Sequence, residues 1–340
     1  MMKFYKATCL AMLMTAGVLQ AQDIHFSQYN ASPLALNPAL TGVNSCDYRV
    51  GLGYRNQWAS VTTPYVTYEL FADAPIIKNI GGASQLSAGL LLFNDVSGDG
   101  NLTNLQAMAS VAYNLSLDGT KDKVLSLGIQ GGLMNKSIDW TKLNWGTMWD
   151  GDEFDPTINP LEPIGEGSMN KFDFNTGLAF YGKFSPNFNL TVGGAAFHLV
   201  APQESFLGDT ENKLGMRISG HLRAGITIGK SFGIMPSLLY QSQSKATELV
   251  VGSDFGYYIN NASFPATIFI GVHDRLDDAI IANIGLDYKN FRFGASYDIN
   301  NSSLDVASSG KGGMEFTLVY TGCILPVIPK HYVMPCPLYY

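Results

Sequence analysis

The stretch from Phe172 to His198 shows a regular alternation between two kinds of side chain. Its first half places apolar residues on one parity and polar or very small residues on the other. Successive side chains of a β-strand point to opposite faces, so this period predicts a strand with one apolar face. A turn follows at Ser185-Pro186-Asn187, and the alternation resumes beyond it. We therefore expect a β-hairpin here.

Later stretches repeat the alternation but place charge and glycine opposite the apolar side chains. Between Arg217 and Gly229 the polar parity holds Arg217, His221 and Arg223. An apolar exterior around a polar interior of small residues is typical of a transmembrane β-barrel. A soluble β-sandwich with one buried face gives the same alternation. The pattern alone therefore leaves both folds open.

The amino terminus has the pattern of a secretory signal peptide. Lys3 and Lys6 precede an apolar run that ends at Leu19, and Ala21 is a small residue suited to cleavage. A membrane-spanning helix needs about 20 apolar residues, and this run is shorter. We expect residues 1–21 to be removed during export.

Composition favours a surface that meets lipid. Hydrophobic residues make up 46% of the chain and charged residues only 14%, where soluble domains average about a quarter. The 36 glycines, 17 tyrosines and 19 phenylalanines suit a barrel with aromatic girdles. Without the two signal-peptide lysines, 19 basic residues face 28 acidic ones, a net charge of −9 that gives no support to nucleic-acid binding.

Fourteen alternating stretches lie between residues 47 and 321. An even number lets a closed antiparallel barrel bring both termini to one side, and closure removes exposed strand edges. Long connections at 95–102, 136–171, 200–216 and 301–312 alternate with short turns, as in outer-membrane barrels whose long loops face outside the cell. One connection, at 75–84, is longer than this rule allows. We predict an all-β antiparallel transmembrane barrel of about 14 strands over residues 47–321, in a Gram-negative outer membrane.

Short motifs stand in a fixed order after the signal peptide. The mature start holds Phe26, Ser27, Gln28 and Tyr29, followed by Asn37, Pro38 and Gly42. The first predicted strand ends with Tyr54, Arg55, Asn56, Gln57 and Trp58, the second ends with Asp73 and Pro75, and Cys336-Pro337 lies near the carboxyl terminus. This combination resembles the PorP/SprF family of the type IX secretion system, the export and gliding-motility machinery of Bacteroidetes.

The resemblance implies an outer-membrane barrel similar in build to the fatty-acid-transporter type. It also implies a partner in protein secretion: members are tied to type IX secretion components, and some help a large secreted surface adhesin to be exported or retained. Some contact a peptidoglycan-binding lipoprotein. Apart from outer-membrane lipid, no cofactor or other ligand is implied.

Enzyme motifs are missing from the sequence. Its five histidines are scattered, and no nucleophile elbow, phosphate loop or His-Glu-x-x-His occurs. We expect a non-enzyme and no catalytic or metal site. The alternatives to a secretion partner are an outer-membrane pore or transporter for small or hydrophobic solutes and, third, a hydrolase assembled from distant residues.

Residues 22–46 precede the barrel and carry few charges. The stretch contains four large apolar residues, Phe26, Tyr29, Leu34 and Leu36. A free linker does not need so many, so an ordered plug in the barrel or across its periplasmic mouth is favoured over a disordered leader. Charged residues of the inward parity, Arg55, Asp298 and Glu315 among them, are expected to pair inside the lumen or to line a solute pathway. Trp58 suits the aromatic belt near the outer interface.

Three cysteines remain after the signal peptide. The periplasm is oxidising, and Cys323 and Cys336 share the proline-containing tail, residues 322–340, so we expect a disulfide between them. Pairing of Cys46 with either tail cysteine stays open. The tail itself docks under the barrel, offers a periplasmic contact for a partner, or is loosely held.

The connection 136–171 holds Trp140, Trp145 and Trp149, followed by several carboxylates. The acidic spacing matches no regular calcium loop, so solvated side chains are expected. Three tryptophans on an exposed loop indicate a lid over the barrel or a contact site for a secreted partner.

Overall fold

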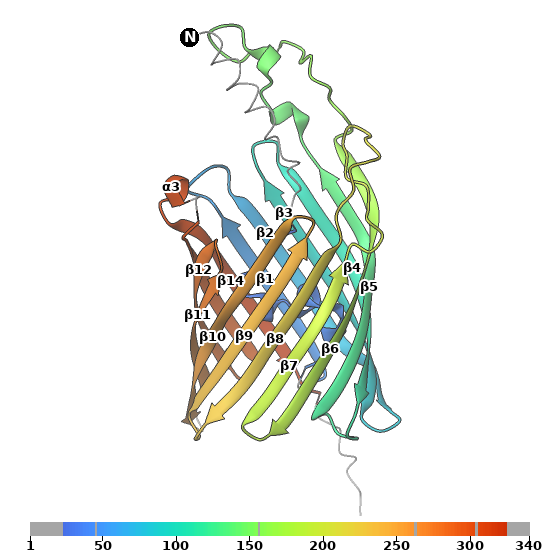
Figure 1. Ribbon diagram of the computed structural model, residues 1–340, viewed down its shortest axis with the longest axis vertical. Helices are drawn as coiled ribbons and strands as arrows, with labels where there is room; N and C mark the ends of the chain where they lie inside the picture. The colour runs from blue at the N-terminus through green and yellow to red at the C-terminus, as the bar shows by residue number, and fades with distance from the viewer. Residues whose placement is uncertain (1–22, 45, 156, 262–263, 303–304, 325–340) are drawn as a thin grey trace, which may run out of the picture.

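The computed structural model describes residues 23–44, 46–155, 157–261, 264–302 and 305–324. Fourteen antiparallel strands form one closed barrel (Figure 1). The strands are β1 Tyr48–Gln57, β2 Tyr65–Ile80, β3 Ser84–Ser97, β4 Leu102–Ser116, β5 Lys123–Ser137, β6 Ser168–Ser185, β7 Phe188–Phe197, β8 Arg217–Ile228, β9 Phe232–Gln243, β10 Ala246–Asn261, β11 Phe264–Arg275, β12 Ala279–Tyr288, β13 Phe291–Asn300 and β14 Lys311–Gly322.

The helices are short, and none of them is part of the barrel wall. They are η1 Tyr29–Ala31, α2 Pro33–Leu36, η2 Pro38–Leu40, η3 Trp140–Lys142, η4 Gly146–Met148 and α3 Asp305–Ser308. Within the described ranges, no helix is long and apolar enough to cross a bilayer.

Each strand pairs with its neighbours in sequence, and β1 closes the barrel against β14. Their register starts with Tyr48 opposite Gly322 and ends with Gln57 opposite Gly313. All ladder hydrogen bonds are therefore satisfied without a free edge, which a chain in hydrocarbon requires. The predicted closed barrel of 14 strands is confirmed.

The two faces of the wall differ as the alternation predicts. On β6, Phe172 and Leu178 are 57% and 52% exposed, whereas the residues that directly follow them, Asp173 and Ala179, are 0% and 4% exposed. The apolar parity thus faces outward, where the membrane lies, and the polar or small parity faces the lumen. β6 and β7 form the hairpin expected around Ser185-Pro186-Asn187.

Short turns gather at one end of the barrel and the long connections at the other (Figure 1). In outer-membrane barrels the long loops face outside the cell, so the short-turn end faces the periplasm. The expectation of a long connection at 75–84 was wrong. β2 continues to Ile80 and β3 begins at Ser84, because register shifts after Pro75 and Ile77 let the pairing run past the proline.

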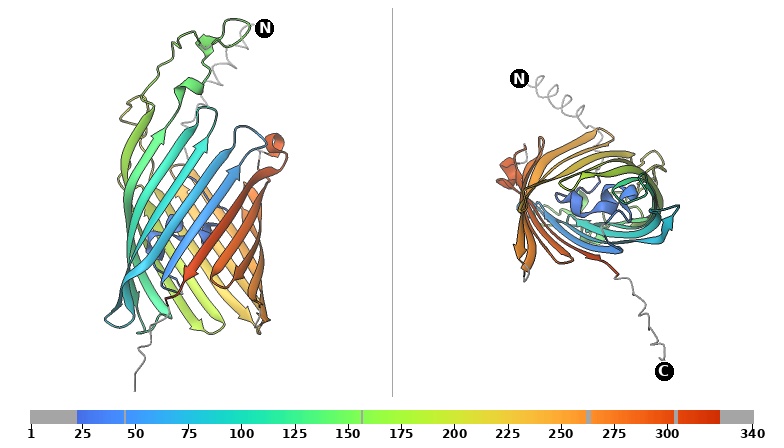
Figure 2. Two further views of the ribbon diagram at one scale, coloured as in Figure 1. Left: turned by 180° about the vertical axis from the view of Figure 1, so that it is seen from behind. Right: turned by 90° about the horizontal axis from the view of Figure 1, so that it is seen from below.

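Residues 23–44, called the N-terminal segment below, lie inside the barrel. The view along the barrel in Figure 2 shows their short helices enclosed by the wall. Tyr29, Leu36, Ala39 and Leu40 form an apolar cluster with inward side chains of β6, β9, β10 and β12. Leu34 packs into a second cluster with Phe71, Leu91, Met108 and Val319. Burial of these apolar groups is a main reason for the segment to stay in the lumen.

Candidate functional site

Ser27 is the centre of a buried ionic network in the lumen. Its hydroxyl donates to the Asp298 carboxylate at 2.6 Å and accepts from Arg55 Nη1 at 2.6 Å and Arg275 Nη2 at 2.9 Å. One donor and two acceptor positions are what a serine hydroxyl offers. Arg55 also pairs with Asp298 at 3.0 Å and with Glu315 at 3.1 Å. The side chain of Ser27 thus joins three strands of the wall.

The backbone of Ser27 and the next two residues, Gln28 and Tyr29, are also bound directly by the barrel wall. The Glu315 carboxylate accepts the backbone N–H groups of Ser27 and Gln28 at 2.8 and 3.0 Å. The Gln28 amide donates to the Glu315 carbonyl at 3.1 Å and accepts from Thr317 at 2.9 Å. The Tyr29 hydroxyl donates to Ser237 on β9 at 2.9 Å. The two bonds to the Glu315 carboxylate are charge-assisted, and such bonds are among the strong ones in proteins.

Asn37 fixes the middle of the N-terminal segment to the opposite wall. Its side-chain oxygen accepts the Ala39 N–H at 2.9 Å and caps η2, which begins at Pro38. Its amide nitrogen donates to the carbonyls of Leu178 and Gly194 at 3.1 and 3.2 Å. These backbone contacts require the chain to approach the sheet very closely.

Two glycines on the wall permit that approach. A Cβ on Gly177 would lie 1.9 Å from Asn37 Oδ1, and a Cβ on Gly128 would lie 2.4 Å from the Pro38 carbonyl. Any larger residue at either position would collide with Asn37-Pro38. The glycine content of the lumen face is therefore part of the binding surface for the N-terminal segment.

The end of the N-terminal segment is fixed around Asp73. This carboxylate accepts the Gly42 N–H at 2.6 Å and pairs with both Nε and Nη2 of Arg49 at 2.9 Å. The Gln85 and Asn114 amides donate to the carbonyls of Gly42 and Thr41 at 2.9 and 3.1 Å. Along its whole length the segment is therefore held by side chains that point inward from the wall.

The start of the N-terminal segment meets a buried histidine. His198, just after β7, lies 2.5 Å from the Asp23 carboxylate through Nε2 and 2.8 Å from Asp173 through Nδ1. Burial by itself lowers the pKa of the His198 imidazole, but the two carboxylates outweigh it and raise that pKa to about 9. Arg217 Nε lies 3.1 Å from the same Asp23 oxygen.

Half of the predicted motif residues converge in this lumen site. Ser27, Gln28, Tyr29, Asn37, Pro38, Gly42, Arg55 and Asp73 belong to it, and Phe26 lines a small lumen cavity beside it. The family model for the type IX secretion system membrane protein PorP/SprF matches residues 18–320. The chain belongs to the PorP/SprF family. The predicted resemblance is confirmed, and so is the location in the outer membrane.

Solved structures share the barrel of this PorP/SprF member. The toluene transporter TbuX of Ralstonia pickettii has 11% identity and a TM-score of 0.50, with 85% of this chain and 92% of that chain covered. The CymD monoaromatic hydrocarbon channel has 13% identity and a TM-score of 0.45, with 86% and 93% covered. These likenesses show the fold alone. Comparison with curated proteins gives no match.

Other motif residues of the PorP/SprF chain lie outside the lumen site. Tyr54 faces outward, with ring centroids 5.3 Å from Tyr68 and 6.5 Å from Phe316. Asn56 donates to the Tyr54 hydroxyl, Gln57 accepts from Arg55 at 3.4 Å, Trp58 packs edge-on against Tyr65, and Pro75 sits at the irregular part of β2. Cys336 and Pro337 lie outside the described residues.

Sequence reasoning placed Arg55, Asp298 and Glu315 on the inward parity but did not link them to Ser27. Arg275, His198 and the glycines around Asn37 were missed altogether. The sequence shows that they are inward-facing or, in the case of the glycines, small. It does not show that all of them contact the N-terminal segment. Only the closure of β14 onto β1 and the path of the N-terminal segment bring them together.

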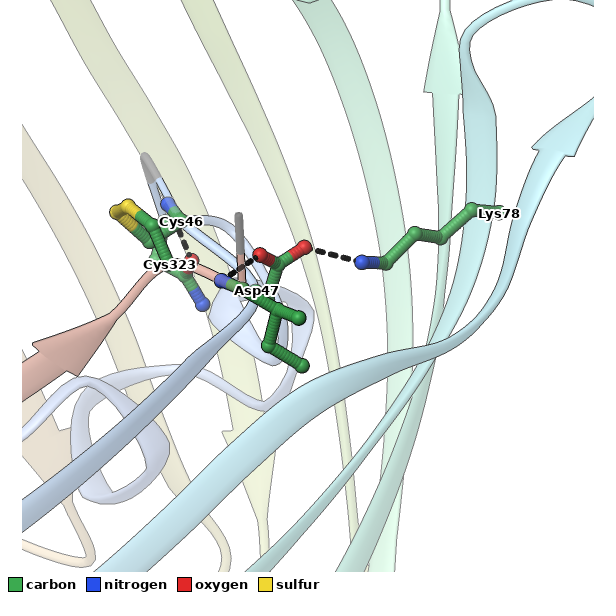
Figure 3. Close-up of a disulfide and its surroundings, with 6 residues drawn as sticks. Cys46, Asp47, Lys78 and Cys323 are labelled. Atoms are coloured by element: carbon green, nitrogen blue, oxygen red, sulfur yellow. Dashed lines mark hydrogen bonds and ion pairs between the residues drawn. A yellow bond between two sulfur atoms is a disulfide. The ribbon is translucent and has the colours of Figure 1, made fainter. Parts of the chain in front are cut away.

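The disulfide joins Cys46 to Cys323, with their Cα atoms 4.6 Å apart (Figure 3). The expected Cys323–Cys336 pair is therefore wrong, and the alternative of Cys46 with a tail cysteine holds. The reason is barrel closure: Cys46 lies just before β1 and Cys323 just after β14, and these strand ends are paired. Beside the bridge, the Asp47 carboxylate accepts from Lys78 and from the Ile324 N–H.

An external arm rises above the barrel at the long-loop end (Figure 1). We define it as residues 138–155 and 157–167 together with 199–216. Trp140 packs on Trp145 and Phe206 with centroid distances of 5.9 and 5.7 Å, so its two loops form one unit. Among the described residues, its carboxylates form no group that would hold a metal ion.

A large cavity lies outside the lumen. It has a volume of about 990 Å³ and is a groove on the outward face at the β1–β14 seam, lined by Leu52, Tyr68, Ile284 and Phe316 among others. Within the described lumen, the cavities above and beside the N-terminal segment measure only about 40 and 50 Å³. A third lies below it and measures about 400 Å³.

Proposed function

We propose that this type IX secretion membrane component is a closed, non-catalytic barrel that binds a large secreted adhesin at the cell surface and helps its export or retention. The observation that carries the proposal is the external arm. The arm combines an acidic character with exposed apolar side chains, which is unusual for a loop that meets only water.

The external arm is strongly acidic. Its two loops hold ten carboxylates against two lysines, a net charge of −8. The carboxylates are Asp139, Asp150, Asp152, Glu153, Asp155, Glu162, Glu166, Glu204, Asp209 and Glu211. A partner with a basic docking surface would be steered toward the arm, and the attraction would weaken as ionic strength rises.

Apolar anchors stand among these charges. Leu161 is 85% exposed, Leu207 61% and Trp149 49%. The backbone bond from the Glu166 N–H to the Phe206 carbonyl at 3.0 Å ties the two loops to each other, and the Lys136–Glu204 ion pair ties the second loop to β5. A surface held in one shape loses less conformational entropy on binding, which favours a specific partner.

The N-terminal segment supports the closed state of the barrel. Its hydrogen bonds to the wall and its two apolar clusters occupy the cross-section of the lumen where an open pore would need water. We propose that it acts as a plug while the partner is handled at the outer face. A peptidoglycan-binding lipoprotein at the periplasmic end is a further partner that family membership supports.

The test of the arm is a paired substitution in the native host. Leu161→Ser with Leu207→Ser should reduce the amount of surface adhesin several-fold while leaving the barrel at its normal abundance. Leu276→Ser is the matched control, because Leu276 is 47% exposed in the β11–β12 connection at the same end but outside the arm. Unchanged adhesin levels in the double variant would exclude the arm as the docking surface.

A solute channel is the second candidate, since the toluene transporter TbuX has a similar barrel. Planar-bilayer recordings separate the two functions. We expect no steady conductance from the intact protein and a large conductance when residues 23–44 are deleted. Steady conductance of the intact protein would favour the channel.

A further inference from the structure

A cavity of about 400 Å³ lies beneath the N-terminal segment at the short-turn end of the barrel. Ala83 in the β2–β3 turn and Lys121 in the β4–β5 turn contribute to its rim, so it belongs to the periplasmic half. Its roof is formed by the N-terminal segment, through Leu36 and Leu40. The volume falls in the range of small-ligand sites, roughly 300–1,000 Å³.

The charged side chains that line this cavity are all basic. Arg49, Lys121 and Arg223 line it, and among the described lining residues there is no Asp or Glu. Arg49 is neutralised by Asp73, but the other two cations are not closely paired. Arg223 lies 3.8 Å from Asp254, beyond hydrogen-bond range, and among the described residues Lys121 has only a longer-range attraction to Asp47. A concave site with cations alone concentrates anions from the surrounding water.

Amide side chains in the same wall retain unused hydrogen-bonding capacity. Asn44 Nδ2, Gln85 Oε1 and Asn114 Oδ1 are buried and have no partner within the described structure. The first is a donor and the other two are acceptors. Buried polar atoms without partners cost free energy, and a ligand with both N–H and C=O groups relieves that cost after small side-chain rotations.

We propose that this cavity binds the carboxylate end of a peptide chain presented from the periplasm. The carboxylate lies between Lys121 and Arg223, an apolar side chain packs against Leu36, Leu40 and Tyr181, and the peptide amides meet the unpaired amide atoms. A simple fatty acid would supply the charge and the apolar body. It has no N–H group for Gln85 and Asn114, and this difference selects a peptide.

The test is calorimetric titration of the full-length protein in lipid nanodiscs, with empty nanodiscs as the blank. The probes are acetyl-Leu-Ala-Leu with a free carboxylate, the same tripeptide as its terminal amide, and octanoate. We expect the free carboxylate to bind about tenfold more tightly than the amide, since one charged hydrogen bond is lost. Weaker binding at higher salt should accompany it. Octanoate should bind more weakly than the peptide.

Substitutions locate the site. Lys121→Gln lies in an exposed turn and should lower affinity several-fold without disturbing the fold, and Arg223→Gln should lower it further. Lys142→Gln, an exposed cation of the external arm, is the matched control and should have no effect. Equal binding of the carboxylate and amide peptides, or unchanged affinity in the Lys121→Gln variant, overturns the site. Octanoate binding as tightly as the peptide overturns the assignment to a peptide.

This site is independent of the proposed docking at the external arm. The arm lies at the opposite end of the barrel, and the calorimetry needs no adhesin. A variant that loses adhesin docking can therefore still be tested for peptide binding, and a variant that loses peptide binding can still be tested for adhesin docking.

Discussion

The guanidinium of Arg55, on β1, donates a 2.6 Å hydrogen bond to the hydroxyl of Ser27 inside the lumen. Arg55 is 1% exposed and Ser27 2% exposed, so water does not screen the contact. Two short motifs that stand 28 residues apart are thus the two halves of one interaction. This relationship explains why a barrel strand and a preceding coil carry such distinctive sequences.

Replacement of Arg55 should strongly destabilise the barrel. Arg55→Gln leaves Asp298 and Glu315 buried next to Ser27 with less positive charge, and breaking a buried pair on one side typically costs about 3–5 kcal/mol. Denaturant unfolding in lipid vesicles measures the change. Arg292→Gln is the matched control, because Arg292 and Asp287 are 41% and 31% exposed and such pairs contribute below about 1 kcal/mol. Equal losses in both variants would refute the special role of the Ser27 network.

A methyl group at Gly177 should displace the N-terminal segment. In Gly177→Ala the new Cβ would meet Asn37 Oδ1 at 1.9 Å, and overpacking of this kind costs about 1–3 kcal/mol. Hydrogen exchange of residues 34–42 should accelerate. Gly220→Ala on β8 serves as the control, since a Cβ there meets nothing within 4 Å. Unaltered exchange in Gly177→Ala would mean that the close approach of Asn37 is not required.

Loss of Cys46 should destabilise the barrel by removing the disulfide, whereas loss of Cys336 in the tail should have no effect. Cys46→Ser removes a bridge that spans 277 residues, and such bridges contribute about 2–5 kcal/mol. We expect earlier unfolding for Cys46→Ser and no change for Cys336→Ser. Mass spectrometry of unreduced peptides should find Cys46 linked to Cys323. A Cys323–Cys336 peptide instead would contradict the Cys46–Cys323 bridge.

Stability should fall as pH rises through the titration of His198. The pKa of this imidazole is about 9 in the fold against an ordinary value of 6.5, so the folded state binds more protons between these values. The contribution is complete below pH 6.5 and is lost as pH passes 9. Unfolding midpoints from pH 6 to 9 should decrease in the native chain and less steeply in His198→Gln. Parallel pH profiles for the two proteins would contradict the role of the Asp23–His198–Asp173 contact.

Local sequence determined the strands and their faces. The alternation around Phe172 and Leu178 depends only on neighbouring residues, because the pleat sends successive side chains to opposite sides. The polar parity therefore identified inward residues such as Arg55 and Glu315, and the even strand number followed by counting. The β2–β3 connection was misjudged because register shifts beyond Pro75 depend on the partner strand, which local patterns do not contain.

Tertiary structure decided which of these residues meet. Ser27 and Asp298 are 271 residues apart, and Cys46 and Cys323 are 277 apart. Their proximity arises from closure of β14 onto β1 and from the path of the N-terminal segment through the lumen. Alternation fixes which way a side chain points, but register and closure, set by hydrogen bonding and packing across the whole barrel, fix what it points at.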